Sequence, residues 1–385
     1  MIARVSRPAG AVSRVALFAG SSAAFLDEAQ GLIGRLIALR HRVLCLAPDM
    51  TEGTAEALAF AGVDSRRLAL APDGWSLMPQ RRAEIDIAKM LSAWGADVVL
   101  ASGGPVMVTG ARAARRAGLT RILAVVDTLS PPAAGASHAS LTPSQRTGIE
   151  RAYAAASVVA CLNHDDRALI EGSGLVPPRQ TPPAVVAGFG VDLSHIAAKP
   201  LPPVDGTSGL TFLMAADESR ETGLLDYCDA ARIVRARTPQ ARFLLATSPF
   251  RSGTPLPSAE LDAAAEACER IATATDIRDL IALSHVFVYP AHRAAMPQRV
   301  LEALAAGRPV ITSATAGCRE TVDERVNGVL VVPGDAGAVA RAAESFLKRP
   351  DLIPAMARAS RQKAERRFDQ RVCVDALLAL MGIDA

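Results

Sequence analysis

Asp127 closes the apolar run RILAVVD (121–127), so its carboxylate stands at the end of a predicted strand. In this position a carboxylate can accept the proton of a hydroxyl group, which is general-base chemistry, or it can cap the next helix. Gly20 and Ser21 follow the first apolar run of the chain, VALFAG (15–20). Because ligands of open α/β sheets bind beyond the carboxyl ends of the strands, we expect these three residues to face a cleft.

A second carboxylate lies in the stretch RAAMPQRVLEALAAGRPVIT (293–312), which predicts a short helix followed by a buried strand. Pro297 fits the first position of the helix, and Gly307 fits the left-handed residue that ends it. Glu302 lies inside this helix. From these residues alone, Glu302 is either an ordinary surface residue of the helix or a member of a binding site.

The elements that must position these residues alternate between strand and helix along the chain. The first series of predicted strands comprises VALFAG (15–20), VLCLAP (43–48), ADVVLASGG (96–104), RILAVVD (121–127), SVVACL (157–162) and AVVAG (184–188). The second series comprises LTFLMA (210–215), ARFLLAT (241–247), VFVYP (286–290), PVITS (309–313) and GVLVVP (328–333). Continuous apolar strands that alternate with helices predict parallel sheets covered on both faces.

A break between the two series contains Lys199-Pro200-Leu201-Pro202-Pro203, and this density of proline is typical of a linker. The pattern therefore predicts an α/β fold of two doubly wound domains that face a cleft. We place the first domain at residues 1–200 and the second at 201–366. Residues 367–385 are expected to form a closing amphipathic helix that packs back toward the first domain.

The composition limits the classes of function. The 385 residues are 50% hydrophobic, which is enough for two domains with separate cores. A net charge of +3 and an aromatic content of 4% argue against a nucleic-acid partner. The six cysteines form no CxxC pair and are predicted to be free thiols in a reducing compartment. No apolar run reaches the length of a membrane span, so we expect a cytoplasmic protein, which can still rest on a membrane surface.

The stretch from Val286 to Asp335 resembles the family 4 glycosyltransferases of the GT-B fold. The matching pieces, in order, are VFVYPA, MPQRVLEALAAGRPVITS, AGCRETV and NGVLVVPGD. The segment AGCRETV is most similar to the bacterial branch that builds capsule, exopolysaccharide and lipid-linked oligosaccharide units. The resemblance implies two Rossmann-like domains, a nucleotide-sugar donor of the UDP or GDP type, retention of anomeric configuration, no metal and no cofactor. It also implies a glycan or polyprenyl-diphosphate-sugar acceptor.

The resemblance assigns donor-binding roles to several residues. Glu302 matches the second acid of the E-x7-E motif, which accepts hydrogen bonds from the nucleotide ribose. Arg293 matches an arginine position and is expected to pair either with phosphate or with Glu302. The loop formed by Gly317, Cys318, Arg319 and Glu320 is expected to lie near the diphosphate, although an ordinary turn is the alternative interpretation.

Other positions depart from the family pattern. Ala294 replaces the first acid of the E-x7-E motif, and Ala295 replaces the glycine that follows it. Asp217 and Thr222 occupy the positions at which this branch has an arginine and a lysine that bind the diphosphate. Arg220 is the nearest cation that can take their place, and its alternative interpretation is a residue of a solvated charged loop.

Two functions follow from this pattern of matches and losses. The first is a glycosyltransferase that carries a sugar from a nucleotide sugar to a lipid-linked or polysaccharide acceptor in bacterial surface glycan synthesis. The second is a catalytically degenerate relative that binds or stabilises a second, active glycosyltransferase. The arginine-rich run ARAARRAGLTR (111–121) is either a solvated helix face or a surface that attracts the anionic lipids of the inner membrane.

Overall fold

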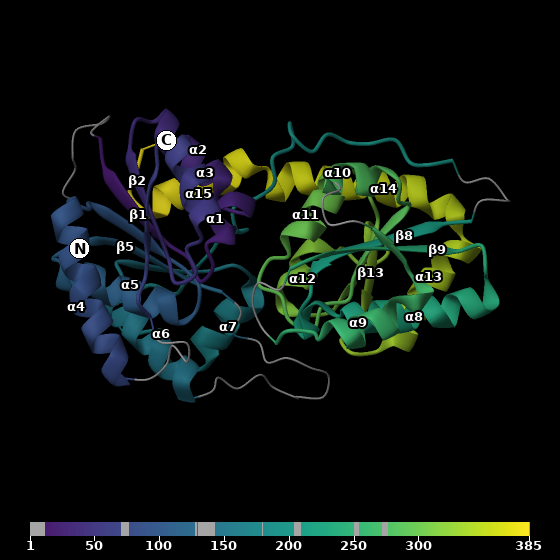
Figure 1. Ribbon diagram of the computed structural model, residues 1–385, viewed down its shortest axis with the longest axis horizontal. Coiled ribbons are helices and arrows are strands. Elements are labelled where there is room, and N and C mark those ends of the chain that lie inside the picture. Colours follow the sequence, from purple (N-terminus) through teal and green to yellow (C-terminus); the bar gives the residue numbers. More distant parts are fainter. Residues whose placement is uncertain are drawn as a thin grey trace.

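The computed structural model describes residues 12–70, 77–127, 129, 143–178, 180–203, 209–249, 254–271 and 276–384. These residues form two α/β domains side by side, with the last helices running along both of them (Figure 1). Each domain contains a parallel sheet with helices on both faces, as the alternating strands and helices predict. The predicted α/β fold of two doubly wound domains is therefore confirmed.

The first domain is built around a sheet whose described strands follow the order β3-β2-β1-β4-β5-β6-β7. Its strands are β1 (Arg14–Phe18), β2 (Arg42–Ala47), β3 (Asp64–Arg67), β4 (Val98–Ala101), β5 (Arg121–Val126), β6 (Val158–Cys161) and β7 (Ala184–Val185). Its helices are α1 (Ala23–Asp27), α2 (Gln30–Ala38), α3 (Glu52–Phe60), α4 (Leu77–Trp94), α5 (Pro105–Arg116), α6 (Pro143–Ala155) and α7 (His164–Gly172). The strand order reverses between β1 and β4, which is the point where doubly wound sheets bind ligands.

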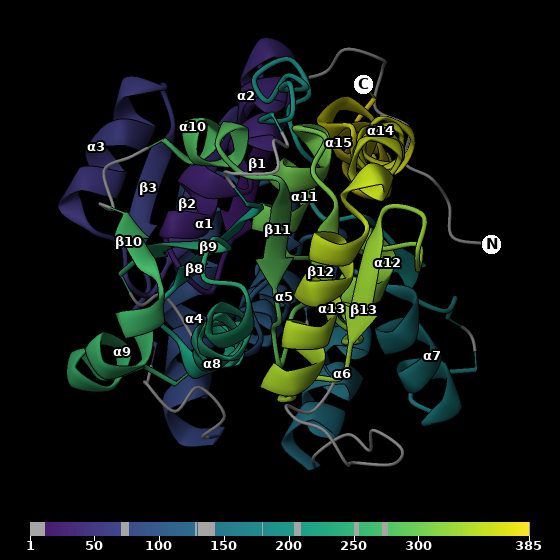
Figure 2. The same ribbon diagram turned by 90° about the vertical axis from the view of Figure 1, so that its right-hand side faces the viewer.

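The second domain repeats this topology with the order β10-β9-β8-β11-β12-β13. Its strands are β8 (Thr211–Asp217), β9 (Arg242–Ser248), β10 (Glu269–Ile271), β11 (Val286–Tyr289), β12 (Val310–Ser313) and β13 (Gly328–Val331). Its α-helices are α8 (Leu224–Arg237), α9 (Ser258–Ala264), α10 (Ile277–Ala282), α11 (Gln298–Ala305), α12 (Ala316–Thr321) and α13 (Ala336–Lys348). The side view shows α8 and α13 next to each other at this sheet (Figure 2). The order reverses between β8 and β11.

The closing segment joins the two domains through α14 (Ile353–Lys363) and α15 (Gln370–Leu380). Val374 and Leu377 of α15 are buried in the same apolar cluster as Leu17 and Leu36 of the first domain. On α14, Arg361 donates hydrogen bonds to the carbonyls of Ile196 and Ala305. The chain therefore returns to the first domain after it has completed the second.

The arginine-rich run is largely used by the fold itself. Arg112 pairs with Glu84 at 2.6 Å, Arg115 donates to the carbonyl of Ala155, and Arg121 donates to the carbonyl of Met381. These contacts account for three of the charges in the run that we considered as a lipid-binding surface. None of the described helices has both the length and the apolar character needed to cross a bilayer.

Candidate functional site

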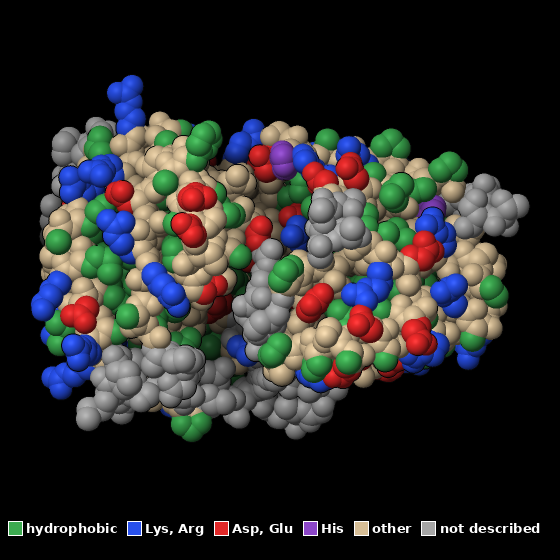
Figure 3. Space-filling view, viewed as in Figure 1, with side chains coloured by type: hydrophobic (Ala, Val, Ile, Leu, Met, Phe, Trp, Pro, Cys, Tyr) green, Lys and Arg blue, Asp and Glu red, His purple; other side chains and the backbone are tan. Residues whose placement is uncertain are grey.

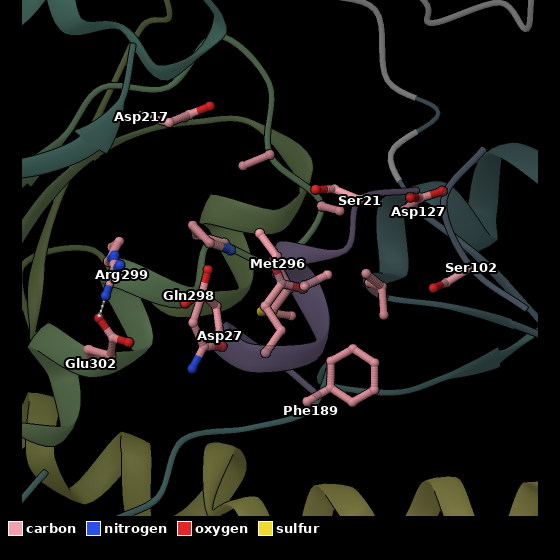
Figure 4. Close-up of a pocket in the computed structure, with 18 of the residues that line it drawn as sticks. Ser21, Asp27, Ser102, Asp127, Phe189, Asp217, Met296, Gln298, Arg299 and Glu302 are labelled. Carbon is pink, nitrogen blue, oxygen red and sulfur yellow. Dashed lines mark hydrogen bonds and ion pairs between the residues drawn. The ribbon is translucent and has the colours of Figure 1, made fainter. Parts of the chain in front are cut away.

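A cleft of about 950 Å³ separates the two domains, and the carboxyl ends of both sheets contribute to its walls. The space-filling view shows the molecule hollowed between the domains (Figure 3). The residues that line the cleft come from the β1–α1 segment, the end of β5, the β8–α8 turn and the beginning of α11 (Figure 4). The cleft lies where the strand order of each sheet reverses, so the topology predicts a ligand site here.

The first-domain wall includes Ser21 and Asp127, whereas Gly20, which we also expected to face the cleft, is not among its described lining residues. The Ser21 hydroxyl donates to the Asp49 carboxylate at 2.8 Å, so this serine is held at the end of β1. Asp127 accepts a hydrogen bond from the Gly104 N–H at 3.1 Å, next to the beginning of α5. Burial raises the pKa of Asp127, against the lowering effect of this N–H. Asp127 therefore lines the cleft and also contacts the start of a helix, and its role as a general base stays a prediction.

Two glycines make this wall possible because their backbones nearly touch. A Cβ atom on Gly103 would lie 2.2 Å from the backbone nitrogen of Gly20, and the φ angle of Gly103 is +89°. A side chain at this position would push the ends of β1 and β4 apart. The sequence showed Gly20 as a strand-end residue, but its partner is revealed only by the paired strands.

The second-domain wall is formed by α11 and the residues that precede it. Glu302 has only 8% of its surface exposed, and its carboxylate accepts a hydrogen bond from Arg299 at 2.8 Å. Arg293 and Gln298 line the cleft beside this pair. Pro297 is the N-cap of α11 rather than its first helical residue, so the predicted helix begins one position later than expected.

Arg299 was not predicted as a site residue from the sequence. The signal was present, because Arg299 and Glu302 lie one turn apart in MPQRVLEAL, a spacing at which side chains of a helix meet. We assigned Arg293 as the alternative partner of Glu302, and the structure adds this second arginine.

The stretch from Gly317 to Glu320 is not the loop that we predicted. It belongs to helix α12, and none of its four residues is among the described lining of the cleft. The Gly317 N–H donates to the carbonyl of Ala294 at 3.1 Å, and a Cβ on Gly317 would lie 2.1 Å from the carbonyl oxygen of Ala295. Gly317 therefore supports the segment that precedes α11, and Cys318 is fully buried beneath it.

The charged members of α12 connect the two domains. Arg319 pairs with Asp165 at 2.8 Å, and Glu320 accepts hydrogen bonds from His164 and Arg367. Because side chains of the first domain occupy both residues, the prediction that they contact the diphosphate finds no support in this arrangement. Sequence spacing gave no sign of these contacts, since Asp165 and His164 lie more than a hundred residues before their partners in α12.

The segment after β8 brings carboxylates, and not cations, to the cleft. Asp217, Glu221 and Thr222 line it, and the Thr222 hydroxyl donates to the Ser219 carbonyl at 2.8 Å. Arg220 lies outside the lining and forms a two-pronged ion pair with Glu260. The prediction that Arg220 replaces the lost basic pair is therefore wrong for this arrangement of the segment.

Carboxylates outnumber cations on the described lining of the cleft. The lining contains eight acids and three arginines, namely Asp27, Glu28, Asp127, Asp192, Asp217, Glu221, Asp276 and Glu302, with Arg278, Arg293 and Arg299. Desolvation and the nearby Asp127 carboxylate raise the pKa of Glu28 to about 7. We did not identify Asp27 or Glu28 from the sequence, although both follow soon after Gly20 and Ser21. The described residues contain no cluster of His, Cys, Asp and Glu suited to holding a metal ion.

Two family models match successive parts of the chain. Residues 27–184 match a "Glycosyl transferase 4-like domain", and residues 209–349 match "Glycosyl transferases group 1". The two matches fall on the first and the second domain in order. Together with the strand orders and the interdomain cleft, they define a GT-B glycosyltransferase fold.

Solved structures and curated relatives agree with this class. Anabaena Alr3699/HepE in complex with UDP and glucose superposes with a TM-score of 0.74 at 18% identity, over 96% of this chain and 99% of that chain. The putative colanic acid biosynthesis glycosyltransferase WcaL of Escherichia coli is 27% identical over 51% of this chain and 50% of the relative. The glycogen synthase of Mycobacterium tuberculosis is 36% identical over 26% of this chain and 25% of the relative. These alignments thus span a quarter to a half of the curated relatives' own length.

Proposed function

We propose that this protein transfers a sugar from a nucleotide-sugar donor to a glycan or polyprenyl-diphosphate-sugar acceptor in bacterial surface glycan synthesis. The observation that carries the proposal is the interdomain cleft of about 950 Å³, with the nearly buried Glu302 on its second-domain wall. UDP is the favoured nucleotide, because HepE, which has a similar fold, is in complex with UDP. The resemblance of the sequence to family 4 transferases further supports retention of anomeric configuration and a hexosyl donor.

In this proposal, Glu302 accepts hydrogen bonds from the ribose hydroxyl groups of the donor. Its ion pair with Arg299 orients the carboxylate, which has about four acceptor sites in all. Arg293 and Arg299 supply the positive charge that a diphosphate needs. Asp127, on the opposite wall, binds the acceptor hydroxyl group.

The experiment that tests this proposal is a calorimetric titration with UDP, UDP-glucose, GDP and GDP-mannose. Loss of one charge-assisted hydrogen bond in Glu302→Gln removes about 1.5–3 kcal/mol, which raises the Kd roughly 10- to 150-fold. Glu266→Gln is the matched control, since this glutamate is exposed and lies outside the described lining of the cleft. The proposal fails if none of the four nucleotides binds at millimolar concentration.

A second candidate function is that of a non-catalytic partner that binds or stabilises an active glycosyltransferase. The excess of carboxylates on the described cleft lining favours it, because Asp217 and Glu221 repel a diphosphate. Co-purification of a second transferase with the full chain, together with no nucleotide binding, is the result that supports this function. Nucleotide binding that is lost in Glu302→Gln contradicts it.

We also propose that the protein works in the cytoplasm and visits the inner membrane face where a lipid-linked acceptor resides. The WcaL relative, named for colanic acid biosynthesis, supports the link to surface glycans. Sedimentation with vesicles of anionic and of neutral lipid tests the location. Equal amounts of protein in the pellets of both vesicle types contradict an attraction to anionic lipid.

A further inference from the structure

We propose that Cys228 and Cys268 form a redox modification site, at which a low-molecular-weight disulfide such as glutathione disulfide oxidises the two thiols to one intramolecular disulfide bond. This inference goes beyond the proposed function and does not rest on it. In the structure both residues are free thiols, which is the form expected in a reducing compartment. Oxidation follows when the share of glutathione disulfide rises.

The two sulfur atoms lie in contact although their residues are 40 positions apart in the chain. Cys228 belongs to α8, and Cys268 directly precedes β10. The two Sγ atoms are 3.9 Å apart, and the Cys268 S–H donates to the Cys228 sulfur. The S–S distance in a disulfide is about 2.05 Å, so the sulfurs must approach each other by roughly 2 Å. A change of side-chain rotamer gives a movement of this size.

The two thiols differ in exposure, and this difference divides the roles between them. Cys228 is completely buried in the apolar cluster of the second domain, whereas Cys268 is partly exposed and packs against this cluster. A molecule of the size of glutathione disulfide can therefore reach Cys268 but not Cys228. Buried as well are the remaining cysteines of the chain, which are Cys45, Cys161, Cys318 and Cys373. Oxidation therefore begins at Cys268.

The charges around the pair favour ionisation of one thiol. The hydrogen bond that Cys268 donates lowers the pKa of Cys228, and the same hydrogen bond raises the pKa of Cys268. Arg232 and Arg270 also lower the pKa of Cys228, whereas desolvation and Asp229 raise it. Because the thiolate is the reactive form of cysteine, a pair that shares one negative charge between two sulfurs is suited to exchange with a disulfide.

The exchange takes place in two steps that balance. The pair starts with the negative charge on Cys228 and the proton on Cys268. The Cys268 sulfur attacks one sulfur of glutathione disulfide while its proton passes along the hydrogen bond to Cys228. The first glutathione leaves as a thiolate with the electron pair of the broken S–S bond. Cys228 then loses the proton to water, and its sulfur displaces the second glutathione thiolate from Cys268. Two electrons thus move from the protein to the glutathione disulfide.

The new bond ties α8 to the edge of the second sheet. β10 is a strand of three residues at this edge, and it pairs with β9. Attachments near it that the structure describes are the ion pair of Arg242 with Glu269 at 2.6 Å and the hydrogen bond from Arg235 of α8 to the Ala267 carbonyl at 2.8 Å. A disulfide at the start of β10 adds a covalent attachment to these contacts and restricts the unfolded chain.

The test incubates the full chain in buffers of reduced and oxidised glutathione and then alkylates the thiols that remain. Mass spectrometry counts the free thiols, and a tryptic map without reductant detects a link between peptides 221–232 and 252–270. The variants are Cys228→Ala and Cys268→Ala. The matched control is Cys45→Ala, which alters a buried thiol of the first domain. Melting curves establish whether each variant is folded.

Wild type and Cys45→Ala should each lose two free thiols and yield the linked peptides, and dithiothreitol should restore both thiols. Cys228→Ala should carry glutathione on Cys268, because the second step is missing, and Cys268→Ala should lose no further thiol. These losses support the proposal.

Three results for wild type overturn the proposal. They are six thiols that all stay free, a link between a different pair of cysteines, and glutathione on Cys268 without the link. The wild-type peptide map decides the question even where a variant fails to fold. Because no nucleotide sugar takes part in this test, failure of the proposed transferase function leaves its result unaffected.

Discussion

Replacement of Arg308 by methionine tests how the linker is fastened to the second domain. Arg308 is completely buried, and no carboxylate is described beside it. Its guanidinium group donates only to backbone carbonyls, which belong to the linker and to the ends of α10 and α11. The acceptors are Lys199, Pro200, Ile281, Ala282, Ser284, Ala306 and Gly307. Desolvation lowers the pKa of Arg308 to about 10, so the side chain remains a cation at neutral pH.

The magnitude follows from the strongest of these bonds. The carbonyls of Lys199, Pro200 and Ser284 each lie 2.8 Å from the guanidinium nitrogen that they accept from. A buried carbonyl that loses its partner costs about 1–3 kcal/mol, so the three contacts together represent about 3–9 kcal/mol. Methionine also removes the cost of burying an uncompensated cation, which is several kcal/mol. We therefore expect Arg308→Met to lower the free energy of unfolding by about 2–4 kcal/mol.

The assay exploits the position of the tryptophans. Both tryptophans, Trp75 and Trp94, belong to the first half of the chain, so their fluorescence reports on the first domain. Far-UV circular dichroism reports on both domains. In urea, Arg308→Met should shift part of the dichroism transition to lower concentration and leave the fluorescence transition near its wild-type position, as separate domains allow. The control is Arg358→Met, which alters an exposed arginine of α14.

Two results would refute this reasoning. The first is a dichroism transition of Arg308→Met that coincides with wild type, which would mean that water replaces the guanidinium group at no cost. The second is an equal shift of the fluorescence and dichroism transitions, which would mean that the two domains unfold as one unit.

Three further predictions concern the cleft and its surroundings. Gly317→Ala places a Cβ atom 2.1 Å from the Ala295 carbonyl oxygen. We therefore expect a lower Tm and, by calorimetry, at least about tenfold weaker UDP binding. Wild-type values of both quantities would contradict the supporting role of this glycine. Asp226 accepts a hydrogen bond from His292 at 2.6 Å, and this bond raises the pKa of His292 above 6.5. The pair therefore stabilises the fold below pH 6.5, and this contribution is lost as pH rises through the folded-state pKa of His292. The Tm difference between wild type and Asp226→Asn should therefore shrink from pH 6 to pH 9, and a constant difference argues against the pair. The pKa of Glu28 rises from 4.5 to about 7 on folding, so its ionisation lowers the stability of the fold as pH rises through this range. The variant Glu28→Gln should therefore have a higher Tm than wild type at pH 8 but not at pH 4. Equal Tm values at pH 8 would contradict this prediction.

The sequence predicted the fold well because its signal is local and repeated. Apolar runs such as RILAVVD recur along the chain, and most of them become buried strands of a parallel sheet. Gly307 has the left-handed φ angle of +74° that its place after α11 requires. The same local reasoning failed for the Gly317–Glu320 stretch, where the helix α12 replaces the predicted loop.

Long-range packing limited the prediction of the site. The chain alone identified Asp127, Ser21 and Glu302, all of which line the cleft, because strand ends and helix starts can be recognised from their neighbours. It did not show that Arg220 pairs with Glu260, since this contact requires the segment after β8 to lie against α9.

The sequence by itself thus determined two α/β domains and several residues that face the cleft, but it did not show the edge strands β3 and β10, which are polar and short. Only the tertiary structure decided which charges are neutralised and which remain available. Arg319 pairs with Asp165, and the Asp127 carboxylate raises the pKa of Glu28, because the fold brings distant parts of the chain together. Local propensities act over a few residues, whereas the partner of a charge depends on where the whole fold places it.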